Sequence, residues 1–215
     1  MCSSDLLGLE GWLPRLVQSA GSKAMIVTVS NGVAPLQLGS AADPHAWQSV
    51  PNVKIYVANI RDALSSADPA DDAVYRANAN RYLKELDALD AEVRAAIAKI
   101  RPERRKLITT HNAFGYFAAA YGVAFLAPVG VSTETEPSAR DIAALIRQIK
   151  AEKIPAVFLE NLSDERLIRR IAAETGAKVG GTLYSDSLTD EKGPAPTYID
   201  LMRHNIKALT SALGN

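Results

Sequence analysis

The chain has 215 residues, 47% of them hydrophobic, and its 24 basic residues balance its 24 acidic residues. This length suffices for one α/β domain or two small lobes, and the lack of net charge or of a basic cluster disfavours nucleic acid as a partner. The single cysteine, Cys2, excludes an internal disulfide. No run reaches the roughly 20 apolar residues that span a bilayer, and the first residues do not resemble a signal peptide.

The N-terminal part is predicted to contain a helix followed by a strand. Apolar residues at three- and four-residue spacing predict a helix over residues 8–19, ended by Ala20-Gly21. The β-branched residues within 24–30 predict a buried strand. One strand cannot close a sheet, so this part is expected either to pack on another lobe or to belong to an incomplete lobe.

A predicted loop over residues 31–42 leads into a second helix. Asp43-Pro44 has the form of a helix cap followed by proline at the first helical position, which would place His45 in the first turn. Pro51 is expected to interrupt this helix before it continues toward residue 67.

The longest predicted element is a helix over residues 68–101. Asp68-Pro69 is a favourable start, and Pro102 ends the run. The helix would be on the order of 50 Å long at 1.5 Å per residue. It is expected to be a strut that joins or backs two units, with an ordinary core helix as the alternative. Its apolar stripe consists of Tyr82, Leu86, Leu89, Val93, Ile97 and Ile100.

After Pro102, predicted strands alternate with predicted helices, which is typical of βαβ units with a parallel sheet. The sequence therefore predicts an α/β protein divided into residues 1–67, a connecting helix over 68–102 and a C-terminal lobe over 103–215. The strands are expected at 106–110, 123–129, 156–160 and 178–184, and the helices at 113–121, 138–152, 164–175 and 197–213.

Polar side chains stand at or just past the carboxyl ends of three of these strands, where ligands bind in open α/β sheets. They are His111, Glu160 and Asp186. Imidazole and carboxylate groups that converge from separate strands are typical of a zinc or manganese site. The alternatives are a structural hydrogen bond for His111, a turn cap for Asp186 and a helix cap for Glu160.

The two other histidines lie on predicted helices. His45, between Asp43-Pro44 and Trp47, would be rigidly directed and partly shielded, with a surface histidine at a helix start as the alternative. His204 lies on the last helix, away from any strand end, and is expected to be solvated.

Four segments together resemble the zinc- and manganese-binding solute-binding proteins of bacterial ABC importers. Members of that family have two α/β lobes joined by one rigid helix, with the metal in the cleft between the lobes. The resemblance extends from about residue 7 to the end of the chain. The segments are Asp43-Pro44-His45-Ala46-Trp47, Thr110-His111-Asn112-Ala113-Phe114-Gly115-Tyr116-Phe117, Val157-Phe158-Leu159-Glu160-Asn161 and Leu183-Tyr184-Ser185-Asp186-Ser187-Leu188. Residues 198–202 and Asn205 also resemble the C-terminal helix of the family.

The resemblance implies that His45, His111 and Asp186 bind the metal ion and that Glu160 supports them by hydrogen bonds without direct ligation. The family's usual fourth ligand, a histidine near the start of the mature protein, has no counterpart in this chain. We therefore expect a truncated or misassigned start, with an incomplete N-terminal lobe, no leader and residues 1–6 unlike the family.

The implied function is capture of a divalent metal ion, zinc or manganese, in the periplasm or at the outer face of a membrane, and delivery to an ABC permease. A monomer without catalytic activity is expected, with metal uptake that weakens as the pH falls through the histidine range. The lack of histidine in 31–42 favours manganese or mixed specificity. The alternatives are a metal-dependent hydrolase that uses the same residues and a surface adhesin.

Overall fold

The computed structural model describes residues 2–4, 7–21, 25–39, 41–128, 130 and 138–214. Ala24 and Val129, the predicted ends of two strands, lie outside these residues, as do Met1, Asp5 and Leu6. The chain divides into two compact units, Met1–Asp90 (unit 1) and Ala91–Asn215 (unit 2), and the boundary falls within the longest helix. The predicted division into three parts stays a prediction.

Unit 1 begins with two paired strands and a short helix. Strand β1 (Cys2–Ser4) pairs in parallel with β2 (Ile26–Thr28), and α1 spans Leu13–Ser19. The predicted helix over 8–19 is therefore too long, since residues 8–12 form turns. Gly8 has a φ of 91°, which a right-handed helix excludes. The predicted loop over 31–42 contains a small antiparallel pair, β3 (Gln37–Leu38) with β4 (Ala41–Ala42).

The segment after this pair forms a short 3₁₀ turn, η1 (Ala46–Gln48), before α2 (Val50–Ala67). The prediction of a helix that starts at Asp43-Pro44 is wrong. Pro51 does not interrupt a helix but lies in the first turn of α2, where its missing N–H costs nothing. The Asp43 side chain bonds to His45 instead of capping a helix.

The predicted long helix is confirmed as α3 (Asp72–Ala98), flanked by the 3₁₀ turns η2 (Pro69–Asp71) and η3 (Pro102–Arg104). Its 27 residues correspond to about 40 Å, shorter than expected. Tyr82 is only half-buried. The other five predicted stripe residues are at most 2% exposed: Leu86, Leu89, Val93, Ile97 and Ile100.

Unit 2 contains the predicted parallel sheet. Its four strands are all parallel in the order β6-β5-β7-β8. The strands are β5 (Lys106–Ile108), β6 (Ala124–Leu126), β7 (Ala156–Glu160) and β8 (Lys178–Leu183). The helices are α4 (Gly115–Tyr121), α5 (Ala139–Glu152), α6 (Glu165–Thr175) and α7 (Tyr198–Leu213).

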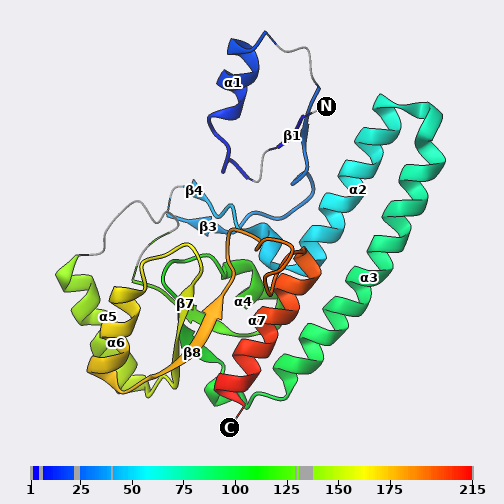
Figure 1. Ribbon diagram of the computed structural model, residues 1–215. Coiled ribbons are helices and arrows are strands. Elements are labelled where there is room, and N and C mark those ends of the chain that lie inside the picture. The colour runs from blue at the N-terminus through cyan, green and yellow to red at the C-terminus, as the bar shows by residue number, and fades with distance from the viewer. Residues whose placement is uncertain are drawn as a thin grey trace. The chain divides into compact units, whose positions relative to one another are not determined.

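The central strand β7 is covered on both faces, and all five of its residues are buried. Val157 and Leu159 belong to a core cluster that contains Ile149 of α5 and Ile168 of α6. Phe158 points to the opposite face because side chains alternate along a strand. In Figure 1, α5 and α6 lie on one side of β7 and β8, and α7 lies on the other.

Strand β8 contains a bulge that depends on glycine. Between the pairs Val157–Val179 and Leu159–Thr182, β8 has one residue more than β7, and Gly181 has a φ of 120°. A Cβ atom at Gly180 would lie 2.5 Å from Phe158 Cζ. It would also lie 2.9 Å from Ala212 Cβ of α7. Glycine therefore allows α7 to approach the sheet closely.

We predict that Gly180→Ala destabilises the protein by about 1–3 kcal/mol, because the added methyl group must displace the Phe158 ring or α7. Gly130→Ala is the matched control, since a Cβ there meets no atom within 4 Å. Urea unfolding of both variants tests the prediction, and equal stability of the two would contradict it.

Candidate metal centre

Three of the predicted site residues lie together at the carboxyl edge of the sheet in unit 2. Glu160 is the last residue of β7, and His111 and Asp186 follow β5 and β8. His111 and Glu160 are 1% and 4% exposed, whereas Asp186 is exposed. The parallel strands bring these distant residues together because their carboxyl ends share one edge.

Glu160 joins the segments that follow β5 and β8. Its Oε1 accepts hydrogen bonds from the backbone N–H groups of Thr110 (2.7 Å) and His111 (3.0 Å). Its Oε2 accepts one from Ser185 Oγ (3.1 Å) and lies 2.5 Å from His111 Nδ1. These four contacts occupy the acceptor sites of a carboxylate, so Glu160 is suited to hold the site together.

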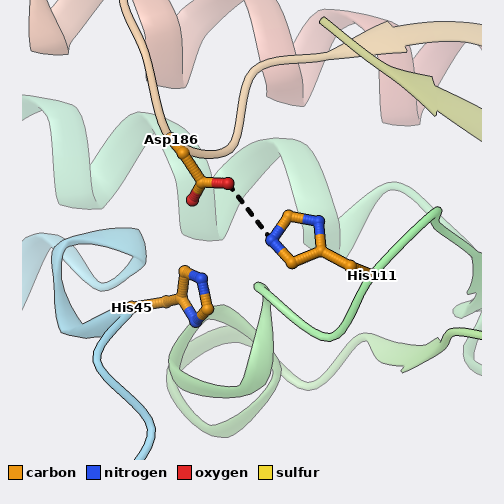
Figure 2. A group of neighbouring side chains, drawn as sticks. All are labelled: His45, His111 and Asp186. Atoms are coloured by element: carbon orange, nitrogen blue, oxygen red, sulfur yellow. Dashed lines mark ion pairs between the residues drawn. The ribbon is translucent and has the colours of Figure 1, made fainter. Parts of the chain in front are cut away.

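His111 is held between two carboxylates. Its Nδ1 faces Glu160, and its Nε2 lies 3.1 Å from Asp186 Oδ2 (Figure 2). Burial lowers the pKa of His111, but hydrogen bonds to Asp186 and Glu160 outweigh it and raise the pKa from 6.5 to about 9. With Nδ1 bound to Glu160, Nε2 is the nitrogen that can bind a metal ion.

His45, in unit 1, has the same local arrangement. Its Nδ1 lies 2.7 Å from Asp43 Oδ1, which also accepts a hydrogen bond from the His45 backbone N–H (3.0 Å). Both side chains are at most 3% exposed, and the Trp47 ring packs edge-on at 5.2 Å. The alternative of a surface histidine is therefore wrong, and Nε2 is the ring nitrogen of His45 that does not face Asp43.

His204 is not solvated as predicted. It is half-buried, its Nε2 lies 3.0 Å from the Thr182 carbonyl oxygen, and its ring packs edge-on against Tyr184 at 4.9 Å. The prediction failed because a glycine-containing strand leaves room for α7 to lie close to β8. His204 therefore contributes to packing of α7 on the sheet.

Sequence reasoning missed two supporting residues. Asp43, two residues before His45, anchors the imidazole, and the Ser185 hydroxyl contacts both Glu160 and Asp186 (3.1 Å each). An aspartate two positions before a histidine could have indicated the first role, because Asp side chains commonly bond backbone N–H groups two residues ahead. No sequence signal indicates the role of Ser185.

The family model described as "Zinc-uptake complex component A periplasmic", ZnuA, matches residues 5–212. The chain belongs to the ZnuA family. This is a family of metal-binding substrate-binding proteins of ABC importers and not a class of enzymes. Neither the hydrolase nor the adhesin alternative gains support from the comparisons.

Among relatives of this ZnuA-family chain, the iron-binding protein YfeA of Yersinia pestis is 36% identical over 99% of the chain and 71% of the relative. The manganese-binding lipoprotein MntA of Halalkalibacterium halodurans is 34% identical over 96% of the chain and 69% of the relative.

A solved structure shows the same fold. The periplasmic zinc-binding protein TroA of Treponema pallidum superimposes with a TM-score of 0.91 at 30% identity, over 97% of this chain and 79% of TroA. The predicted α/β fold class is thereby confirmed. In the part of the chain that the structure describes, no helix has the length and apolar character needed to cross a membrane.

We predict that the His111 imidazole of the metal-free protein titrates near pH 9 in an NMR titration. A pKa raised from 6.5 to about 9 on folding stabilises the native state. That stabilisation is complete below pH 6.5 and is lost as the pH rises through 9. Urea unfolding should therefore show this loss in the native chain and not in His111→Gln. Titration of His111 at or below pH 6.5 would contradict the prediction.

Proposed function

We propose that this protein captures a divalent transition metal ion, zinc or manganese, outside the cytoplasm and delivers it to the permease of an ABC importer. It does so as a monomer and without catalysing a reaction. Membership of the ZnuA family supports this function. The observation that carries it is the pair of buried histidines, each with Nδ1 anchored on a carboxylate.

The proposed ligands are His45 from unit 1 and His111 and Asp186 from unit 2. Each of these side chains offers a ligand atom that could hold a metal ion (Figure 2). Glu160 and Asp43 would orient the two imidazoles, since metal-binding histidines usually donate their second N–H to a carboxylate or carbonyl.

The chemistry of this ligand set suits a transition metal. Imidazole nitrogen and carboxylate oxygen bind zinc, and further oxygen ligands such as water would favour manganese. Related proteins are described as iron-, manganese- and zinc-binding. The segment 31–42 contains no histidine, which favours manganese or mixed specificity over zinc alone.

The metal ion would compete with a proton. At neutral pH the metal-free His111 is protonated, because its pKa is about 9, so binding through Nε2 releases that proton. The affinity should therefore rise with pH up to about 9. Relatives such as MntA are lipoproteins, which supports a location outside the cytoplasmic membrane.

Calorimetric titration with Zn²⁺ and Mn²⁺ tests the proposed ligands. We expect His45→Ala, His111→Ala and Asp186→Ala each to weaken binding by more than about 100-fold, beyond the usual effect of a supporting residue. Val74→Ala is the control and should bind normally, because Val74 is an exposed residue of α3. Unchanged binding in His111→Ala would exclude the proposed function, and unchanged binding in His45→Ala alone would exclude a contribution from unit 1.

The two supporting carboxylates give a separate prediction. Glu160→Gln and Asp43→Asn should each lower metal affinity about 10- to 100-fold, since a neutral amide no longer favours the N–H of the imidazole. The readout is metal affinity from competition with a chromophoric chelator, and thermal unfolding identifies variants that are destabilised. Full affinity in a stable Glu160→Gln variant would show that the orienting contact is unimportant.

A further inference from the structure

Helix α7 holds the end of β8 through two consecutive residues. Asn205 Oδ1 accepts a hydrogen bond from the Tyr184 backbone N–H (2.9 Å), and Asn205 Nδ2 donates one to the Tyr184 carbonyl (2.8 Å). The preceding residue, His204, contacts the Thr182 carbonyl oxygen at 3.0 Å. The Asn205 amide thus pairs with both backbone groups of Tyr184, as a neighbouring strand would do at the edge of the sheet.

This contact lies beside the site. Tyr184 is followed directly by Ser185 and Asp186, so the clamped peptide is two residues from a proposed metal ligand. Asn205 is 2% exposed, and such a buried amide is held firmly because breaking its hydrogen bonds would leave buried polar groups unpaired. The hydroxyl of the next residue, Ser185, forms hydrogen bonds with the Glu160 and Asp186 carboxylates.

The same helix is also tied to α3. Arg203 forms two hydrogen bonds with Glu92, from Nε to Oε2 and from Nη2 to Oε1, both 2.8 Å long. Consecutive residues of α7 therefore contact α3 on one side and β8 on the other. The exposed ion pair adds little by itself, but α7 also buries Leu201, Met202 and Leu209, so the Asn205 amide is carried by a packed helix.

We propose that Asn205 is a positioning residue for metal binding, which sets the place of the Asp186 carboxylate by clamping the Tyr184 backbone. This inference rests on the proposed function, since it takes Asp186 as a ligand. Asp186 itself is exposed and follows the end of its strand. Without the clamp its backbone could move away from His111 Nε2. The amide of Asn205 thereby preorganises an exposed ligand.

A double-mutant cycle on the full chain tests this role. Zn²⁺ affinity is measured by chelator competition for the native chain, Asn205→Ala, Asp186→Ala and the double variant. We expect Asn205→Ala to weaken binding about 10-fold in the native background. It should have little further effect once Asp186 is removed, because the clamp acts through that carboxylate.

Leu209→Ala is the control for a purely structural effect. Leu209 is a buried residue of the same helix, 1% exposed, and its loss should lower thermal stability while the folded protein keeps its metal affinity. If Asn205→Ala does not fold, Asn205→Asp replaces it, since that variant keeps the acceptor for Tyr184 N–H and puts an oxygen against the Tyr184 carbonyl. It should also weaken binding.

Equal effects of the Asn205 substitution with and without Asp186 would overturn the inference, as would native affinity in a folded Asn205 variant. Either result leaves the proposed function intact. Native affinity in Asp186→Ala would instead remove Asp186 from the ligand set and with it the basis of this inference.

Discussion

The arrangement of the candidate ligands in unit 2 depends on one buried carboxylate, Glu160. Removing a charged group from water is costly unless every acceptor site is paired. Glu160 meets this requirement with partners from the segments after β5 and β8: two backbone N–H groups, the His111 ring and the Ser185 hydroxyl. Because Glu160 is itself part of β7, it ties three strand ends into one rigid edge.

Each buried histidine of the proposed ligand set is oriented in the same way. Asp43 accepts from His45 Nδ1, and Glu160 faces His111 Nδ1. A carboxylate at Nδ1 fixes the ring orientation and makes Nε2 a better electron donor toward a metal ion. In His111 the two flanking carboxylates also raise the pKa to about 9, so a proton is the natural competitor of the metal. A ligand set of nitrogen and oxygen atoms accepts several divalent metals, which agrees with relatives described as binding iron, manganese and zinc.

Local signals predicted the elements of unit 2 well. Ser138, Asp164 and Thr197 each cap a helix by accepting a backbone N–H, and Gly176 ends α6 with a φ of 76°. The same reasoning failed at Asp43, although aspartate followed by proline is a favourable helix start. There the carboxylate binds the nearby imidazole, and the helix starts later, at Val50.

The sequence alone determined which segments of unit 2 form strands, because apolar periodicity is a local property, and hence that His111, Glu160 and Asp186 would lie at one edge. The predicted end was right for β7, whereas β5 and β6 end before the predicted positions 110 and 129. Only the tertiary structure decided which side-chain atoms pair by hydrogen bonds around the candidate site. Glu160 accepts a hydrogen bond from the His111 backbone N–H, 49 positions away along the chain. Asn205 accepts one from the Tyr184 backbone N–H, 21 positions away. Such pairs leave no local pattern in the sequence, because the two residues become neighbours only when the chain is folded.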